Sequence, residues 1–456
     1  MTDFDLVVIG GGTGNNVAAA AADAGLNTAL VEPGPLGGTC LNRGCNPSKM
    51  LIQAANAANH VREAERFHVD ATFDGIDTAA VVDEMDDLLG GLANKKEAAY
   101  REKANLTLFD EYTEFVGERT LDLGGESVTA DKVVVATGSQ PIVPPIDGLD
   151  KVDYLTSQDA LYLRDLPESL VILGGGYIAV ELGYYFESVG TDVTIIEMMD
   201  SLVPREDGEV AAAFTEIAAE RHEVYTGHRV TAVEEGGEGH AVHAETEDGE
   251  ELTVEGSEVL VALGRRPTSD GLGLDVAGIA VDDRGFIETN EYLETSAEGV
   301  WAQGDVAGNA LFKHSGDYET RYTIANAVHG ERRAVDFAAM PHTIFTEPQI
   351  AGVGSTEEEL QETGTDYRVG RAAFSDSAMG RAKKLDEGFV KVLAAPDGEI
   401  MGTHIIGHEA STLLHEAVVA MRHRLGVDAV GGTIHAHPTL SKVVEAAFRD
   451  VSAESA

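Results

Sequence analysis

The two cysteines of the chain, Cys40 and Cys45, lie in the segment GGTCLNRGCNPSK of residues 37–49. No second pair accompanies them, so the sequence lacks the ligands that a tetrahedral cysteine metal site needs. A C-x4-C pair in an intracellular protein indicates redox chemistry, in which two thiols and a disulfide interconvert. The spacing is a little over one helical turn, so we expect both sulfurs near one face at a helix start. There the helix dipole and Lys49 are expected to lower the thiolate pKa.

A glycine loop precedes this pair, between a strand and a helix. The strand DLVVIG leads into GGTGNN, an alanine-rich helix and a second strand that ends on Glu32. Gly10 and Gly12 fill the first two positions of a dinucleotide-binding fingerprint, whose third position holds Asn15. We expect Asn15 to loosen the packing of helix on strand slightly, and Glu32 to accept hydrogen bonds from an adenosine ribose. The expected nucleotide-binding residues here are Gly10, Gly12, Thr13, Gly14 and Glu32.

The same pattern returns at residues 169–197, where SLVILG leads into GGYIAVELG and TDVTIIE ends on Glu197. Gly174, Gly176 and Ala179 give the fingerprint G-x-G-x-x-A. A carboxylate at Glu197 accepts a hydrogen bond from a ribose 2′-hydroxyl and repels a 2′-phosphate, and the following MMDS holds no arginine to receive that phosphate. Two such units predict two bound dinucleotides, and the second favours NADH over NADPH.

Charge narrows the classes of partner. The 456-residue chain carries 79 acidic and 32 basic residues, for a net charge of −47. Such a surface repels nucleic acid and anionic membranes, so we expect neither as a partner. Molar salt screens charge over about 3 Å, and the composition resembles that of proteins from salt-accumulating halophiles. The apolar runs are too short for a membrane span, and a strand begins too close to Met1 for a signal peptide, so we expect a cytoplasmic protein.

The cysteine segment and the two glycine loops together resemble those of the FAD-dependent pyridine nucleotide–disulfide oxidoreductases, over essentially the whole chain. The resemblance implies that Cys40 is the interchange thiol that attacks a substrate disulfide, and that Cys45 is the charge-transfer thiol against the flavin. Lys49 is implied to lie by flavin N5 and to pair with Glu181. Tyr177 resembles the aromatic gate that covers the nicotinamide pocket.

Further motifs extend the resemblance. Thr137 and Gly138 in VVVATG, and Asp305 in WAQGDV, match segments that hold the FAD pyrophosphate and ribityl chain. Thr39 and Gly264 are also expected to bind cofactor. IHAHPTLSKVVEAAF at 434–448 resembles the interface motif that carries the acid/base histidine.

In that motif His437 is implied to reach across a two-fold interface into the partner's active site, which predicts a homodimer. The family usually has a glutamate five residues after this histidine, where this chain has Lys442. Glu445 lies too far along the helix to be a simple replacement, so the partner of the His437 ring stays open.

The predicted fold is therefore α/β, with two Rossmann-like dinucleotide-binding domains, for FAD and for NAD(P)H, and a C-terminal α+β dimerisation domain. The expected domains are an FAD-binding domain with the redox pair at 1–145, an NAD(P)H-binding domain at 146–265, a central FAD-binding segment at 266–335 and the dimerisation domain at 336–456.

The implied activity passes electrons from NAD(P)H through FAD and the Cys40–Cys45 disulfide to a small-molecule disulfide, with His437 protonating the leaving thiol. Arg43 and Asn46 stand where the family usually has apolar residues. Further basic residues lie at Lys95, Lys96, Arg101, Lys103 and the RAKK run of 381–384. Such basic residues either form an ordinary solvated surface or bind the substrate. In the second case they favour a substrate with several carboxylates.

The predicted substrate is therefore bis-γ-glutamylcystine, reduced for thiol redox homeostasis in a halophile. The alternative is a dihydrolipoamide dehydrogenase of a 2-oxoacid dehydrogenase complex. Family analogy with small-disulfide reductases favours NADPH, in conflict with Glu197.

Overall fold

The computed structural model describes residues 3–237 and 239–453. The chain forms two compact units, each assembled from three stretches of sequence. The first unit holds Met1–Met50, Ala79–Ile142 and Gly264–Asp336, and the second holds Leu51–Thr78, Val143–Leu263 and Phe337–Ala456. The domain boundaries at 145, 265 and 335 stay predictions.

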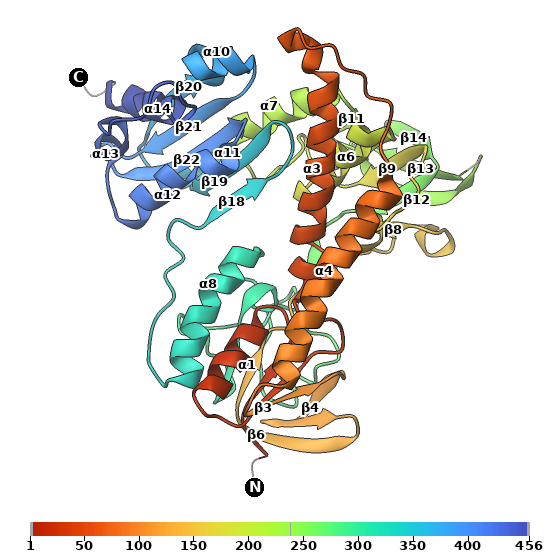
Figure 1. The fold of residues 1–456 in the computed structure, drawn as a ribbon, viewed down its shortest axis with the longest axis vertical. Coiled ribbons are helices and arrows are strands. Elements are labelled where there is room, and N and C mark those ends of the chain that lie inside the picture. Colours follow the sequence, from red (N-terminus) through yellow and green to blue (C-terminus); the bar gives the residue numbers. More distant parts are fainter. Residues whose placement is uncertain (1–2, 238, 454–456) are drawn as a thin grey trace. The chain divides into compact units, whose positions relative to one another are not determined.

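The first unit is built on a seven-stranded sheet (Figure 1). Its parallel strands are β1 (Phe4–Ile9), β2 (Thr28–Val31), β3 (Leu106–Phe109), β17 (Val300–Ala302) and the end of β6 (Glu126–Val135). The antiparallel strands β4 (Thr113–Gly117) and β5 (Thr120–Leu123) extend the start of β6. The run Leu6–Ile9 is buried on both faces of β1, as expected for an apolar strand in the middle of a parallel sheet.

The helices of the first unit are α1 (Gly14–Asp23), α2 (Gly38–Asn42), α3 (Cys45–Arg62), α4 (Thr78–Arg101) and α8 (Lys313–Thr323), with a 3-10 turn η3 (Gly304–Ala307) and the π-helical turn η4 (Ile324–Val328). Helix α1 begins after the first glycine run, and helix α3 begins at Cys45. A short ribbon pairs β7 (Ser139–Pro141) with β16 (Arg265–Pro267). The buried alanines of α1 let its backbone lie close to the sheet. Helix α3 continues from the first unit into the second after Met50.

The middle part of the second unit repeats the plan of the first. Its parallel sheet has the order β11-β10-β9-β15-β8. These strands are β8 (Leu155–Thr156), β9 (Ser169–Leu173), β10 (Asp192–Ile196), β11 (Glu223–Tyr225) and β15 (Glu258–Val261), with helices α5 (Ser157–Ala160), α6 (Tyr177–Val189) and α7 (Gly208–Ala219). A separate antiparallel sheet holds β12 (Arg229–Gly236), β13 (Gly239–Glu245) and β14 (Glu251–Gly256). Short 3-10 turns are η1 (Ala64–Phe67) and η2 (Leu149–Lys151).

The C-terminal part of the second unit is an antiparallel sheet of order β18-β19-β22-β21-β20 (Figure 1). Its strands are β18 (Pro341–Ile344), β19 (Gln349–Gly354), β20 (Arg368–Ala373), β21 (Phe389–Ala394) and β22 (Ile400–Gly407). Its helical elements are α9 (Glu357–Glu362), η5 (Phe374–Asp376), α10 (Ala378–Lys383), α11 (Ala410–Leu413), α12 (His415–Arg422), α13 (Val427–Gly431) and α14 (Ser441–Ala453). The apolar face of α14 packs on this sheet through Val443, Val444, Ala447 and Phe448. The predicted fold class is confirmed.

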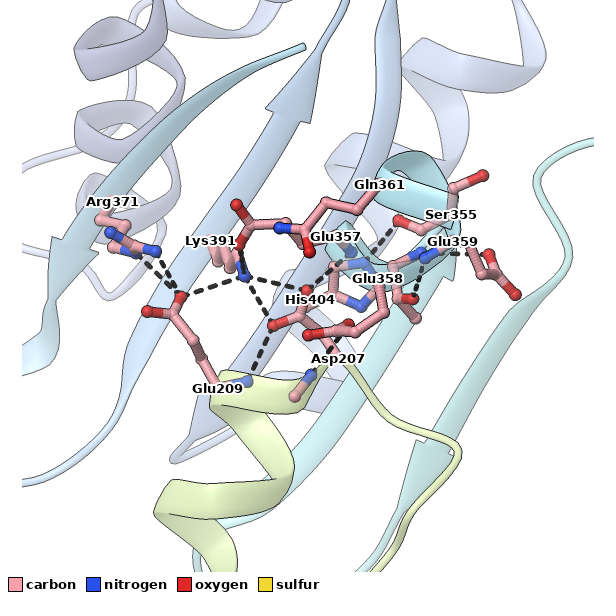
Figure 2. A network of polar contacts seen from close by, with 12 residues as sticks. Asp207, Glu209, Ser355, Glu357, Glu358, Glu359, Gln361, Arg371, Lys391 and His404 are labelled. Carbon is pink, nitrogen blue, oxygen red and sulfur yellow. Dashed lines mark hydrogen bonds and ion pairs between the residues drawn. The ribbon is translucent and has the colours of Figure 1, made fainter. Parts of the chain in front are cut away.

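A buried charge network joins α7 to the C-terminal sheet within the second unit (Figure 2). Lys391 on β21 and Asp207, at the N-cap of α7, are both fully buried. The ammonium group of Lys391 lies 2.8 and 3.0 Å from the Asp207 carboxylate oxygens and 2.5 Å from a Glu357 oxygen. Asp207 also accepts the backbone N–H of Glu209, so one carboxylate both caps the helix and neutralises a buried cation.

Across residues 3–237 and 239–453, every helix is too short or too polar to cross a lipid bilayer.

Candidate active site

The first glycine loop is a tight turn between β1 and α1. Gly10 has φ +107°, and a Cβ there would lie 2.2 Å from the Ala136 carbonyl oxygen, so only glycine fits. The Glu32 carboxylate accepts the backbone N–H groups of Gly11 at 2.6 Å and Gly34 at 3.0 Å. Burial raises the pKa of Glu32, while these two hydrogen bonds act in the opposite direction. The carboxylate is thus fixed at the loop by the backbone.

Asn15 differs from its expected effect. Its side chain is buried and donates to the carbonyl oxygens of Gly11 at 2.8 Å and Gly12 at 2.6 Å. The close approach of helix to strand falls instead to Gly14, where a Cβ would lie 2.9 Å from Val8 Cγ1. The expectation that Asn15 loosens this packing was therefore wrong, because its amide ties the loop to the helix.

The cysteine pair spans two helices. Cys40 lies inside α2 and is half-buried, whereas Cys45 is the exposed first residue of α3. Both side chains are thiols, and the Cys40 sulfur lies 3.8 Å from Asn46 Oδ1. A hydrogen bond with the Cys45 thiol, followed by burial, raises the pKa of the Cys40 thiol, and nearby Lys313 acts in the opposite direction. The expected lowering was wrong for Cys40, because a second thiol and burial outweigh the cation.

The residues implied to flank the flavin ring lie in different units. Lys49 is on α3 in the first unit, where its ammonium donates to Ser48 Oγ at 3.3 Å. Glu181 is on α6 in the second unit, nearly buried, and accepts the backbone N–H of Phe345 at 2.8 Å. Their mutual ion pair stays a prediction. Tyr177 is the first residue of α6 and is 40% exposed, and its role as a gate stays a prediction.

The second glycine loop repeats the geometry of the first. Gly174 has φ +102°, and Gly176 precedes α6, in which Ala179 is buried. The Glu197 carboxylate accepts the N–H groups of Gly175 at 2.5 Å and Met199 at 2.8 Å. Glu197 therefore occupies the place in this loop that Glu32 occupies in the first.

The segments expected around the FAD chain meet in the first unit. Thr137 donates through its hydroxyl to the Thr268 carbonyl oxygen at 2.7 Å, and Gly138 has φ +74°. Asp305, in η3, accepts a hydrogen bond from the Ser139 hydroxyl. Ser139 in turn accepts from Arg265 Nε at 2.8 Å. Ser139 at the start of β7, itself bound by Arg265 at the start of β16, thus fixes the Asp305 carboxylate.

His437 is exposed and lines a hollow of about 310 Å³ within the second unit. Arg381, Lys442 and Asp376 also line it. Arg381 donates to the Asp376 carbonyl oxygen at 2.7 Å, which fixes its guanidinium at the wall.

Glu445, close to this hollow, contacts Lys442, Arg449 and His435. It pairs with Lys442, and its Oε1 lies 2.8 Å from Arg449 Nη2. Its Oε2 lies 3.7 Å from Nδ1 of His435, whose Nε2 lies 2.7 Å from a Glu416 oxygen. Lys442 therefore binds the nearest glutamate, and the histidine of this motif that contacts Glu445 and Glu416 is His435.

Comparison with known proteins decides the family. Residues 4–333 match the pyridine nucleotide-disulphide oxidoreductase family, and residues 340–448 match the dimerisation domain of that family. The chain is a pyridine nucleotide–disulfide oxidoreductase.

Relatives of this oxidoreductase match it from end to end. A dihydrolipoyl dehydrogenase of Halobacterium salinarum is 38% identical over 97% of this chain and 94% of the relative. That of Cupriavidus necator is 35% identical over 97% of each chain. The structure of the HOCl-induced flavoprotein disulfide reductase RclA from Escherichia coli superposes with a TM-score of 0.86 at 27% identity, over 98% of this chain and 99% of the other. Relatives from halophiles agree with the halophile composition.

The oxidoreductase uses FAD and NAD(P)H, and its first unit has features that fit FAD. The first turn of α1 contains no acidic residue, so its N-terminus suits a phosphate. Gln303 donates to Thr13 Oγ1 at 3.1 Å, while its own Oε1 is buried and has no hydrogen-bond partner among the described residues. The buried Gln303 Oε1 beside the glycine loop can accept a hydrogen bond from a hydroxyl or N–H group of a bound cofactor.

The dimerisation domain supports a homodimer.

Several site residues escaped the sequence analysis. Ser139 and Gln303 stand next to motif residues that were identified, so motif adjacency was the available signal. Arg265 contacts Ser139, which is 126 residues away in the sequence, and His435 lies outside the positions that matched the family motif.

Two of the basic residues named in the sequence are engaged in ion pairs. Arg101 pairs with Glu97 and Asp110, and Lys103 pairs with Asp23 at 2.6 Å. These two residues are therefore ordinary ion-paired surface.

Proposed function

We propose that this oxidoreductase is a dihydrolipoamide dehydrogenase that uses NAD⁺. The observation that carries the proposal is the Cys40 and Cys45 thiol pair in a chain that matches enzymes named dihydrolipoyl dehydrogenase over 97% of its length. The reaction takes two electrons and two protons from dihydrolipoamide to give lipoamide, and NAD⁺ becomes NADH with release of one proton. Bound FAD supplies the two-electron transfer between the cysteine pair and the nicotinamide.

The roles of the protein side chains follow from thiol–disulfide exchange. A substrate thiolate attacks Cys40 of the oxidised pair, which breaks the Cys40–Cys45 bond and forms a mixed disulfide. The second substrate thiolate then attacks its own first sulfur, closes the lipoamide ring and frees Cys40. His437 accepts the protons that the substrate thiols lose. This half-reaction leaves Cys40 and Cys45 as two thiols, which must return to the disulfide as their two electrons pass on to NAD⁺.

The preference for NAD⁺ is supported by Glu197. Its carboxylate is held at the second glycine loop by two backbone N–H groups, at 2.5 and 2.8 Å. In that position a negative charge repels a ribose 2′-phosphate and still offers lone pairs to a 2′-hydroxyl.

A second candidate is the reduction of bis-γ-glutamylcystine, which the hollow beside His437 favours. Two of its lining residues, Arg381 and Lys442, are cationic, in a chain whose net charge is −47. An anionic disulfide gains from these charges, whereas neutral lipoamide does not. Asp376 and Glu445 offset part of that gain, which is why we place this function second.

One kinetic comparison tests both candidates. In molar KCl, kcat/KM is measured for dihydrolipoamide with NAD⁺ and for bis-γ-glutamylcystine with NADH and NADPH. The proposal expects the dihydrolipoamide value to exceed the other by at least tenfold. A larger value for bis-γ-glutamylcystine would replace the first candidate with the second, and failure of both substrates would reject the two together.

A further inference from the structure

The buried carboxylate of Glu319 has no part in the chemistry described above. Glu319 lies on α8 and is fully buried. It accepts the backbone N–H of Gly304 at 2.5 Å and the side-chain N–H of Asn309 at 3.2 Å. Gly304 begins η3 with φ +72°, directly before Asp305. The carboxylate therefore holds the turn that presents Asp305.

The neighbouring residue on α8 holds the other flavin-binding loop. Thr320 Oγ1 accepts from Gln303 Nε2 at 2.9 Å, and the same nitrogen lies 3.1 Å from Thr13 Oγ1 in the first glycine loop. A Cβ at Gly316 would lie 3.0 Å from Thr13 Cγ2, so α8 also touches that loop directly. Glu319 thus belongs to one buried network that fixes both the glycine loop and the Asp305 turn.

The charge of Glu319 depends on the pH near neutrality. Burial is the main cause that raises the pKa of Glu319 to about 7; its two hydrogen bonds lower it, and the Asp305 carboxylate raises it further. From the adjoining loops come Thr13 and Asn309, which do not titrate. On α8 itself, Lys313 and Asp317 pair with each other.

We propose that Glu319 is a positioning residue for FAD that takes up a proton when FAD binds, so that the affinity for FAD falls as the pH rises. The pyrophosphate brings negative charge to the loop that this network fixes. Negative charge stabilises the neutral form of a buried carboxyl group, and linkage then requires proton uptake on binding. For a single proton the dissociation constant rises by at most about tenfold per pH unit. The inference rests on the use of FAD, not on the identity of the disulfide.

The test follows release of flavin from the holoenzyme. Wild-type protein is diluted in molar KCl at pH 6 to 9, and free FAD is measured by its fluorescence at equilibrium. The proposal expects release to increase as the pH rises through about 7. A flat wild-type profile over this range contradicts the proposal whatever the variants do.

Two variants separate proton uptake from a purely structural role. Glu319→Gln resembles the neutral carboxyl group, so it should retain FAD above pH 8 better than the wild type and should flatten the profile. Glu319→Ala loses both hydrogen bonds and should release FAD at every pH. Glu84→Gln, an exposed position on α4 of the same unit, removes the same charge and should follow the wild type.

Two results would overturn the inference. One is a Glu319→Gln profile that parallels the wild type, and the other is release of FAD by Glu319→Gln at every pH while its far-ultraviolet circular dichroism stays native. Dihydrolipoamide and bis-γ-glutamylcystine play no part in these measurements, so the substrate proposals can fail independently.

Discussion

The Glu197 carboxylate accepts the backbone N–H of Gly175 at 2.5 Å, and Glu32 accepts that of Gly11 at 2.6 Å in the same manner. Each glycine loop is thus closed on the acidic residue that ends the following strand. In the second loop we expect this bond to hold the Glu197 carboxylate beside a ribose, so that its charge selects between NADH and NADPH.

Replacement of Glu197 should change the nicotinamide preference. In Glu197→Gln the amide oxygen can still accept from the loop, but the negative charge is lost. We expect kcat/KM for NADH to fall by roughly tenfold, about the size of one charged hydrogen bond, and the NADPH/NADH ratio to rise. Steady-state kinetics with both dinucleotides measure this. A wild-type enzyme that already prefers NADPH would show that Glu197 does not set the preference.

Replacement of the interchange thiol should separate flavin binding from turnover. Cys40→Ser removes the sulfur that forms the mixed disulfide but leaves the first glycine loop intact. We expect the visible flavin spectrum to persist and disulfide turnover to fall by roughly 10⁴-fold. Ser127→Ala, at an exposed serine on β6 of the same unit, serves as the control. Retained turnover in Cys40→Ser would remove Cys40 from the mechanism.

Short sequence motifs predicted the parts of the site that form within one short segment of the chain. The turn at Gly10 follows from a strand, a glycine run and a helix within one short segment, and it occurs where expected. The effect of Asn15 was missed because its amide donates back to the carbonyl oxygens of Gly11 and Gly12, a contact that the fingerprint pattern does not show.

Interactions between distant segments could not be predicted in the same way. The raised pKa of Cys40 depends first on its hydrogen bond with the Cys45 thiol and then on burial, and the spacing of the two cysteines predicts neither. Lys391 and Asp207 are 184 residues apart, and no periodicity shows that both become buried together.

The Lys391 network should carry much of the stability of the second unit (Figure 2). Lys391→Met leaves the Asp207 carboxylate buried without its cation, which typically costs about 3–5 kcal/mol. Thermal unfolding in molar KCl should show a lower Tm. Lys151→Met, at an exposed lysine of the same unit, is the matched control. Equal Tm values for the two variants would mean that water or other groups solvate Asp207.

His222 should make stability depend on pH below neutrality. Burial lowers the pKa of His222 to about 4, and its Nδ1 has no hydrogen-bond partner among the described residues. The neutral His222 ring therefore contributes its full stabilisation at a pH above about 6.5, the ordinary pKa of histidine. That stabilisation is lost as the pH falls toward 4. Between pH 7 and pH 5 this amounts to roughly 2 kcal/mol. His222→Phe should remove that part of the pH dependence in urea unfolding, and an unchanged dependence would assign it to other groups.

Arg381 gives the sharpest distinction between the two candidate substrates. Its guanidinium is fixed at the wall of the hollow beside His437 by the Asp376 carbonyl oxygen, at 2.7 Å. If carboxylates of the substrate bind there, Arg381→Gln should lower kcat/KM for bis-γ-glutamylcystine by about tenfold, chiefly through KM, and molar salt should weaken the difference. Arg66→Gln, at a cation of the same unit that pairs with Asp386, is the matched control. Equal losses of kcat/KM for bis-γ-glutamylcystine and dihydrolipoamide would show that Arg381 has a structural role in the wall of the hollow and does not bind substrate carboxylates.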